Sequence, residues 1–387
     1  MKLLLPLTLL SPISAGILVP PPTGPYAVAS KVQEIIDPNR TEDPILPDSR
    51  SKGRRLLFSV FMPVKKPEKQ YCRVDIVPYM TPKVATDYGK QAAAAGLSSD
   101  LYSVFSMEFC NLNHISPCGG AGRSTPKYPV VLFTPGLGES RMLYGAGARS
   151  LASHGYVVVT VDHPYETNFV EFPDGTSIQG HNIAGNDTAA IERLVEVRTA
   201  DLSFLIDQLH NRTLVKPLLG SFSGSLDLSR LVVYSHSLGG AAAATLTRTN
   251  KRVLGGIDID GQLVNPIKSL RLNKPFLLAG RYNHSSTDPT WNQFWPHLTG
   301  PRMELAINGT AHGSFTDRPL LVSALSLPES AMKSVEGLIG SIDGRRLDEI
   351  VNGVLISFFD YVFCKRDQEL KRLPKRYAEV SVPRYNL

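Results

Sequence analysis

Blocks of apolar and polar residues alternate along the chain from residue 128 onward, in lengths that suit strands and helices. Short apolar runs rich in β-branched residues predict strands. They cover residues 128–134, 156–162, 231–234, 254–259, 274–279 and 303–307. Between and after them, apolar residues at helical spacing predict helices over 140–153, 187–209, 238–249 and 345–363, the last with Asp343 as its N-cap. This alternation is typical of an α/β fold, with a mostly parallel central sheet and helices on both faces.

The chain before residue 128 has a less regular pattern. Residues 54–64 predict another strand, whereas residues 80–125 mix helical stretches with Gly and Pro and are interpreted as an insertion. The expected organisation is a signal peptide at 1–15, an N-terminal extension at 16–53, one main α/β domain at 54–365 and a basic C-terminal tail at 366–387.

Composition excludes some classes of protein but does not indicate a particular reaction. The 387 residues are 42% hydrophobic and 20% charged, which excludes a disordered or fibrous chain. No apolar stretch reaches the roughly 18 residues of a membrane-spanning helix. The net charge of +6 is mild; it fits a solvated surface, or a weak attraction to anionic lipid surfaces. Basic pairs between residues 365 and 376 are interrupted by acids and lack interleaved aromatics, so we expect no nucleic-acid partner.

The first residues carry the pattern of a secretory signal. Lys2 precedes a short leucine-rich stretch that ends in small residues near Ala15. Asn-x-Ser/Thr tripeptides, the acceptor pattern for N-linked glycans, agree with export. They begin at Asn39, Asn186, Asn211, Asn283 and Asn308. We therefore expect a secreted, extracellular glycoprotein.

Four cysteines in an exported chain predict up to two disulfides, with three possible pairings. Cys110 and Cys118 are close in sequence and form the easiest pair to expect, leaving Cys72 and Cys364. No two cysteines have the short spacing of a zinc site, so we expect no metal. An oxidising compartment also argues against a cysteine nucleophile.

The segment 233–241, VYSHSLGGA, combines a strand, a sharp turn and an Ala-rich helix. This is the context of a nucleophile elbow, in which a serine on a strained turn stands above the sheet. The nucleophile would be Ser237. Gly239 matches the second glycine of the G-x-S-x-G pattern, and Ser235, which is also small, replaces the first.

Two backbone amides are candidates for an oxyanion hole. The amide of Leu238, the residue after the nucleophile, lies at the start of a helix, where N–H groups are free. The second candidate is the amide of Leu137, because Gly136 and Gly138 on either side permit an unusual turn after the strand 128–134.

A serine hydrolase of this kind needs an acid and then a histidine later in the chain. His284, His297 and His312 follow Ser237, and His312 fits best because it comes directly after the strand 303–307. Asp258 and Asp260 both lie on the strand 254–259 or at its end and face the same side. Asp260 is preferred because it is at the tip; Asp258 would then be a buried acid satisfied by backbone donors.

The runs 133–138, 151–156, 235–240, 256–260 and 307–317 together resemble the platelet-activating-factor acetylhydrolase family, which includes the plasma lipoprotein-associated enzyme and secreted fungal relatives. The resemblance covers about residues 20–365. It implies the α/β-hydrolase fold, no cofactor, and calcium-independent removal of a short or oxidised sn-2 acyl group from a phospholipid, the reaction of a 1-alkyl-2-acetylglycerophosphocholine esterase. The family's nucleophile, acid and histidine fall on Ser237, Asp260 and His312, and its oxyanion amides on Leu137 and Leu238.

Two departures from the family affect the substrate more than the chemistry. The chain has Ser235 where the family usually has Gly, and Thr134-Pro135 where the plasma enzyme has a Ser-His pair. The alternative hypotheses are therefore a secreted carboxylesterase, cutinase, polyester hydrolase or lipase with the same triad, or a catalytically silent hydrolase fold used for binding. The aromatic segment 290–296 could line an acyl site or pack in the core. The insertion 80–125 could be a lipid-binding lid or a plain surface elaboration.

Overall fold

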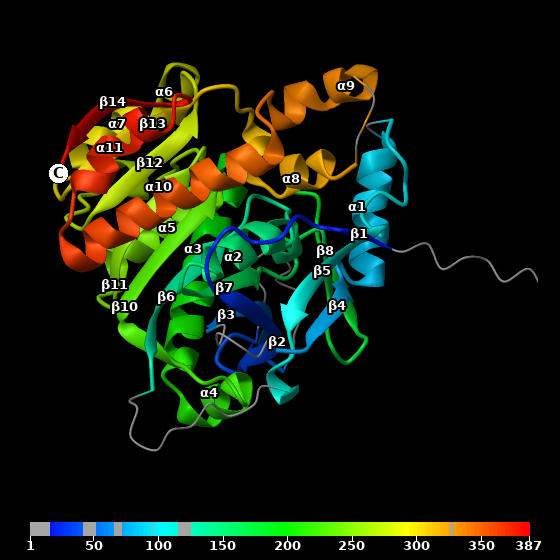
Figure 1. The fold of residues 1–387 in the computed structure, drawn as a ribbon. Helices are drawn as coiled ribbons and strands as arrows, with labels where there is room; N and C mark the ends of the chain where they lie inside the picture. Colours follow the sequence, from blue (N-terminus) through cyan, green and yellow to red (C-terminus); the bar gives the residue numbers. More distant parts are fainter. Residues whose placement is uncertain are drawn as a thin grey trace, which may run out of the picture.

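The computed structural model describes residues 16–41, 52–65, 72–94, 96–114, 125–325, 327 and 329–387. The expected signal peptide over 1–15 and Cys118 lie outside the described residues. A nine-stranded sheet in the order β14-β13-β12-β11-β10-β6-β7-β3-β2 forms the centre of the molecule (Figure 1). Its strands are β2 (Ala27–Asp37), β3 (Arg54–Val64), β6 (Lys127–Thr134), β7 (Val157–Asp162), β10 (Ser225–His236), β11 (Val253–Ile259), β12 (Phe276–Arg281), β13 (Arg302–Ile307) and β14 (Val380–Asn386).

The six central strands, from β7 to β13, are parallel, and antiparallel pairs occur only at the two ends of the sheet. The expected mostly parallel sheet is therefore confirmed. The strands differ from the expected ranges mainly in length: β10 begins six residues before Leu231, because its first half is only half-buried and its apolar pattern is weak.

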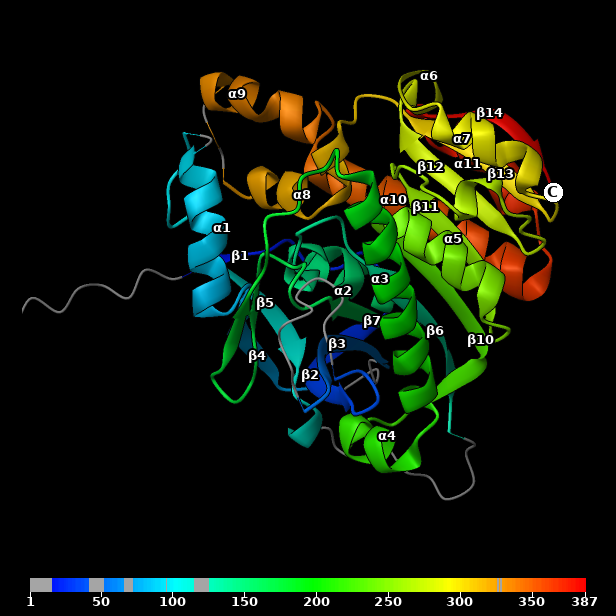
Figure 2. The same ribbon diagram turned by 180° about the vertical axis from the view of Figure 1, so that it is seen from behind.

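Helices cover both faces of the sheet, as expected. α2 (Gly145–Ala152) and α10 (Gly344–Cys364) pack on the face that carries Val131 and Phe133. α3 (Thr188–Leu209) and α5 (Gly239–Thr249) pack on the face that carries Val130 and Leu132, and they stand in front in Figure 2. The Asp343 side chain accepts hydrogen bonds from the Arg345 and Arg346 amides, which confirms it as the N-cap of α10.

The shorter elements surround this core. They are the hairpin β8 (Phe169–Glu171) and β9 (Ser177–Gln179), and the helices α4 (Arg212–Leu219), α6 (His284–Thr287), α7 (Thr290–Phe294), α8 (Arg318–Ser323), α9 (Glu329–Ile339) and α11 (Gln368–Arg376). No helix in the described part of the chain is long and apolar enough to cross a membrane.

Both ends of the described chain belong to the central sheet, which corrects the expected domain boundaries. β2 pairs with β3 along its whole length, so residues assigned to an N-terminal extension form one edge of the sheet. β14, red in Figure 1, forms the other edge, and Leu370 and Leu373 of α11 are buried. The expected tail is thus structural. Its composition misled because an edge strand and a surface helix bury only one face, which leaves their other residues charged.

The described part of the region 80–125 is tied to a second, small sheet. β1 (Ile17–Leu18), β4 (Val74–Pro78) and β5 (Phe105–Cys110) pair in the order β1-β5-β4. α1 (Pro82–Ala94) follows β4 and is one of the helical stretches expected in this region. Tyr79, Tyr88 and Phe105 are buried in the hydrophobic cluster shared with α2 and α10, so this region packs against the main body.

A disulfide joins Cys72 to Cys110, with 5.5 Å between their Cα atoms. The expected pairing of Cys110 with Cys118 is therefore wrong. Antiparallel pairing of β4 with β5 sets Val74 opposite Cys110 and brings Cys72 alongside, a non-local contact that sequence distance does not reveal. Cys364 is a free, exposed cysteine.

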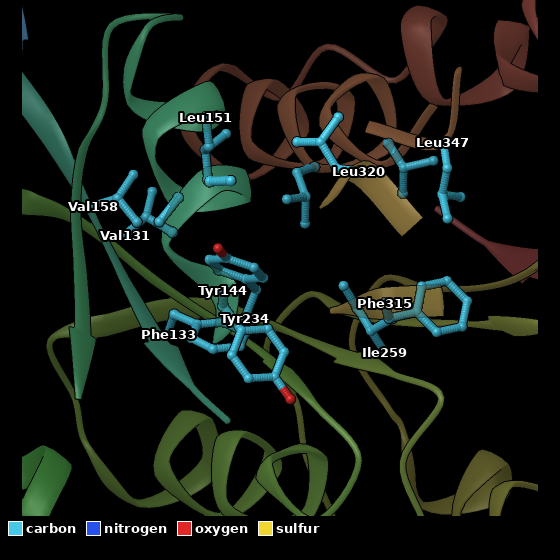
Figure 3. Close-up of a cluster of buried hydrophobic side chains, with 14 of the residues drawn as sticks. Val131, Phe133, Tyr144, Leu151, Val158, Tyr234, Ile259, Phe315, Leu320 and Leu347 are labelled. Carbon is cyan, nitrogen blue, oxygen red and sulfur yellow. The ribbon is translucent and has the colours of Figure 1, made fainter. Parts of the chain in front are cut away.

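Aromatic side chains fill the core beneath the centre of the sheet. The Phe133 ring lies between those of Tyr144 and Tyr234, at centroid distances of 4.5 and 4.6 Å (Figure 3). Leu320 and Leu347 face this group from α8 and α10. Tyr144 also contacts polar groups at the carboxyl ends of the strands. The aromatic packing therefore holds these strand ends in place from one side.

Candidate active site

The turn between β10 and α5 places Ser237 above the carboxyl end of the central strand. Its φ of 56° lies in the left-handed region, which is costly for a residue with a side chain. The Ser237 amide donates to the Ile259 carbonyl at 2.9 Å, so the neighbouring strand β11 holds the strained turn in place. The expected elbow geometry is present.

Small residues around Ser237 are required by close backbone contacts. A Cβ added to Gly239 would lie 2.4 Å from the Thr134 carbonyl oxygen, so no larger residue fits between α5 and β6. Ser235, which replaces the usual first glycine, is accommodated because its hydroxyl donates to the Ile257 carbonyl at 2.8 Å. This departure from the motif therefore leaves the turn intact.

Ser237, His312 and Asp260 form a continuous hydrogen-bonded chain. The His312 Nε2 atom lies 3.0 Å from Ser237 Oγ, and His312 Nδ1 lies 2.7 Å from Asp260 Oδ2. The three residues follow β10, β13 and β11, whose carboxyl ends meet at one edge of the sheet. Ser237 is half-buried and His312 is 49% exposed, so the site is open to solvent, whereas Asp260 is buried.

Asp260 is the most heavily bonded carboxylate of the site. It accepts hydrogen bonds from His284 Nδ1 at 2.8 Å, from the Arg281 amide at 2.9 Å and from the Arg281 guanidinium. Burial alone would raise the pKa of Asp260, but the hydrogen bonds from His284 and His312 outweigh it and hold the pKa well below its usual range. Asp260 is therefore ionised at any working pH and can stabilise a positive charge on His312.

His284 is a member of the site that the sequence analysis did not find. His312 fits better as the general base, yet the His284 ring binds the second oxygen of Asp260 and stacks on Trp291 at 3.9 Å between centroids. A signal existed: His284 directly follows β12, the neighbour of β11, so its position also falls at the carboxyl edge. His297 makes no described contact with these residues.

We expect the stabilising effect of His284 to disappear at alkaline pH. Burial disfavours its charged form, but the hydrogen bond to Asp260 and the Asp288 carboxylate, 3.5 Å from Nε2, raise the pKa of His284 to about 9. A folded pKa above the unfolded value of 6.5 means that the stabilisation is complete below pH 6.5 and is lost as the pH rises through about 9. Wild type should exceed His284→Gln in unfolding free energy by on the order of 2 kcal/mol near pH 7, and this gap should close towards pH 10.

Urea unfolding of both proteins across this range measures the gap, and His297→Gln provides a control histidine outside the cluster. The control measures the cost of replacing a histidine that makes no described contact with Asp260. Parallel curves for wild type and His284→Gln would refute the assignment.

Asp258, the alternative acid, has a different role. It is buried and accepts hydrogen bonds from the Gly261 amide at 3.0 Å and the Trp291 indole at 3.1 Å. Burial raises the pKa of Asp258 well above its usual range, which disfavours the negative charge that a triad acid needs. Asp258 was expected to be a buried acid with backbone donors; it is buried, and one of its two donors is a backbone amide and the other a side chain.

His236 supports the loop that carries His312. Its Nδ1 atom lies 2.9 Å from the Tyr144 hydroxyl and its Nε2 atom 3.0 Å from the His312 carbonyl oxygen. Burial, with His312 close by, lowers the pKa of His236 to about 3, so the ring is neutral. It therefore places His312 without competing for a proton.

The amides of Leu137 and Leu238 lie on the two chain segments next to Ser237. A Cβ on Gly136 would lie 3.3 Å from Ser237 Cβ, which brings the loop after β6 against the nucleophile. Leu238 is the N-cap of α5, where helix amides are free. Within the described residues, neither amide donates to a protein acceptor, so both are available to a ligand.

The other predicted sites lie partly at the surface and partly in the core. All five glycosylation candidates, Asn39, Asn186, Asn211, Asn283 and Asn308, are exposed. Trp291 and Phe294 are buried in the core, so this part of the aromatic segment packs rather than lines a pocket. Among the described residues, no group of three His, Cys, Asp or Glu side chains could hold a metal ion.

Comparisons with known proteins show which proteins the chain is similar to. The family model of platelet-activating factor acetylhydrolase, isoform II, matches residues 19–172. The chain is 28% identical to a probable 1-alkyl-2-acetylglycerophosphocholine esterase of Arthroderma benhamiae, an alignment that covers 96% of this chain and 95% of that protein. It is 23% identical to platelet-activating factor acetylhydrolase of Cavia porcellus, over 60% of this chain and 57% of that protein.

A solved structure resembles almost the whole molecule. The ferulic acid esterase of Streptomyces cinnamoneus superposes with a TM-score of 0.74 at 28% identity, covering 96% of this chain and all of that one. The matching relatives are ester hydrolases, and the sheet has the strand arrangement of an α/β-hydrolase fold. The chain is therefore an ester hydrolase with the α/β-hydrolase fold, and its sequence is similar to those of platelet-activating factor acetylhydrolases.

Proposed function

We propose that this protein is a serine esterase that removes the short sn-2 acyl group of phospholipids similar to platelet-activating factor. The hydrogen-bonded series Asp260–His312–Ser237, at 2.7 and 3.0 Å, carries the proposal that the chemistry is serine-based. The Arthroderma benhamiae relative, which aligns over 96% of this chain, supports the choice of substrate. Such substrates assemble into aggregates, so peripheral contact with a lipid surface is part of the proposal.

The proposed mechanism assigns one task to each group. His312 Nε2 takes the proton of Ser237 as its Oγ attacks the ester carbonyl carbon. The oxyanion of the tetrahedral intermediate accepts hydrogen bonds from the Leu137 and Leu238 amides. Asp260 holds His312 in the tautomer that presents Nε2 to Ser237 and stabilises the imidazolium cation. His312 then protonates the departing alcohol, leaving an acyl-enzyme.

Water completes the cycle. His312 removes a proton from a water molecule, which attacks the acyl-enzyme carbonyl, and the second tetrahedral intermediate releases the carboxylic acid and regenerates the Ser237 hydroxyl. Each step uses protein side chains and amides, so we expect the rate to be unchanged by EDTA.

A second substrate class is favoured by a specific observation. The ferulic acid esterase of Streptomyces cinnamoneus shares 28% identity with this chain, the same value as the Arthroderma benhamiae relative. A site open to solvent at His312, which is 49% exposed, would also admit an aromatic acyl group. A general carboxylesterase, cutinase or polyester hydrolase remains in the same class, since pocket shape rather than fold determines the substrate.

The decisive experiment compares three esters under identical conditions in EDTA. Acetate release from a 2-acetyl ether phospholipid is measured beside hydrolysis of methyl ferulate and of p-nitrophenyl butyrate, with Ser237→Ala as the blank. We expect the phospholipid to have the highest kcat/KM. Hydrolysis of the butyrate without phospholipid release would keep a serine esterase and reject this substrate. A preference for methyl ferulate would assign the aromatic class instead.

We also propose that the protein is exported and glycosylated. The Cys72–Cys110 disulfide is typical of an oxidising compartment, and the five exposed acceptor asparagines support the same route. Culture fractionation followed by glycosidase treatment tests this: the enzyme should be recovered from the medium and should lose mass on deglycosylation.

A further inference from the structure

Arg198, in the middle of α3, has a fully buried guanidinium that packing alone does not require. It is 1% exposed and forms a buried ion pair with Glu166, also 1% exposed. Burying charges costs free energy, which such a pair recovers only when further hydrogen bonds satisfy its remaining donors. The acceptors that the remaining Arg198 donors bind therefore indicate the role of the Arg198–Glu166 pair.

The remaining donors of Arg198 converge on the loop after β6. Nη2 donates to the Gly136 carbonyl oxygen at 2.9 Å, and Nη1 donates to the Pro135 carbonyl oxygen and, at 3.3 Å, to Thr134 Oγ1. Two consecutive carbonyls of one loop are thus held by a single planar side chain, whose Nε atom is in turn fixed by Glu166 at 2.8 and 3.0 Å.

The Gly136 carbonyl belongs to the same peptide group as the Leu137 amide. Because a peptide group is planar and trans, its C=O and N–H bonds point in opposite directions. A donor that fixes the carbonyl oxygen on one side therefore fixes the direction of the N–H on the other. The Gly136 carbonyl also accepts from the Glu139 amide at 3.2 Å, within the same turn, and the Gly136 amide is held by the Tyr144 hydroxyl at 3.2 Å.

We propose that Arg198 is a positioning residue that orients the Leu137 amide for oxyanion binding by gripping the Gly136 carbonyl, and that Glu166 keeps its guanidinium in place. This inference rests on the proposed function, because it takes Leu137 as an oxyanion donor. Arg198 makes no contact with Ser237 or His312; its effect passes through one peptide group. Loss of Arg198 would leave Leu137 free to turn its N–H away, while substrate binding elsewhere would be unchanged.

The test uses p-nitrophenyl butyrate, so its outcome does not depend on the natural substrate. Arg198→Met and Arg198→Lys are compared with Arg149→Met, in which an equally buried arginine that donates to the Val19 and Pro20 carbonyls is lost far from Ser237. Removal of an oxyanion donor costs about 100- to 1000-fold in kcat. If the Leu137 N–H points away from the oxyanion for only part of the time, kcat should fall by about 10- to 100-fold, and KM should stay within about threefold of wild type.

The second measurement is the inhibition constant of a trifluoromethyl ketone. Ser237 Oγ adds to the ketone carbon, its proton passes to His312, and the carbonyl oxygen becomes an oxyanion in the hole. We expect Arg198→Met to weaken this inhibitor by the same factor as kcat, Arg198→Lys to lie between Arg198→Met and wild type, and Arg149→Met to match wild type once corrected for folded fraction.

Equal effects of Arg198→Met and Arg149→Met, or a rise in KM without a fall in kcat, would overturn the proposal and leave Arg198 a structural residue. If Arg198→Met fails to fold, Arg198→Lys and Glu166→Gln carry the test, and wild-type kcat in both would overturn it. A wild-type enzyme that hydrolyses neither the butyrate nor the 2-acetyl ether phospholipid would instead contradict the proposed function.

Discussion

Replacing Ser237 with alanine is expected to lower kcat for ester hydrolysis by about a million-fold, the effect of removing the nucleophile from a preformed triad. The hydroxyl is 3.0 Å from His312 Nε2, and its loss leaves no atom to form an acyl-enzyme. The residual rate would come from the oxyanion amides and from substrate binding. Alanine at this position keeps the same backbone conformation, so the elbow should persist and the variant should fold.

Ser235→Gly is the matched control, because it removes a serine two residues earlier, near the end of β10. The Ser235 hydroxyl donates to Ile257, and glycine is the usual residue of the motif, so this variant should retain most of its activity. Labelling with an organophosphate fluoride provides an independent measurement: wild type and Ser235→Gly should take up the label and Ser237→Ala should not. Labelling of Ser237→Ala would place the nucleophile elsewhere.

Replacing Asp260 with asparagine is expected to lower kcat by about ten-thousand-fold. An asparagine amide facing His312 Nδ1 would favour the wrong tautomer, with the proton on Nε2, where it cannot accept the serine proton. The carboxylate also balances His284 and Arg281, so the variant should lose stability as well as activity. Rates must therefore be measured where circular dichroism shows a folded protein.

Asp258→Asn is the matched control for that experiment. Burial raises the pKa of Asp258 well above its usual range, which favours the uncharged form that asparagine resembles. An asparagine oxygen can keep the hydrogen bond that the Gly261 amide donates to Oδ1, and the Trp291 indole, which donates to Oδ2, also donates to the Gly261 carbonyl oxygen at 2.7 Å. We expect activity within a few-fold of wild type. The reverse ranking, with Asp258→Asn inactive and Asp260→Asn active, would transfer the role of triad acid to Asp258.

The order of strands and the local turn chemistry made most of the site predictable. Ser237 could be found because strand, small residues and helix follow each other within nine residues, and His312 because it directly follows a strand of a parallel sheet. Parallel strands bring their carboxyl ends to one edge, so these two positions had to meet near Asp260. A local sequence pattern was therefore enough to predict these positions, because residues that follow parallel strands lie at the same edge of the sheet.

Contacts between distant segments were not predictable in this way. Arg198 lies 62 positions from Gly136 along the chain, and nothing in its own helix marks the carbonyls that it binds. Cys72 reaches Cys110 only because β4 pairs with β5. The strand β14 escaped notice because half of its residues face solvent, which weakens the apolar alternation by which a strand is recognised.

That last strand also bears on how the protein behaves at high concentration. The outer edge of a sheet offers unpaired backbone groups to any other strand, including one from a second copy. β14 carries Pro383, which has no N–H to donate, and its pairing with β13 is interrupted between Glu304 and Ala306. Arg384, paired with Glu304, adds a charge at the same place. Together these features oppose strand addition, so the chain segment that completes the sheet also protects the folded protein against edge-to-edge aggregation.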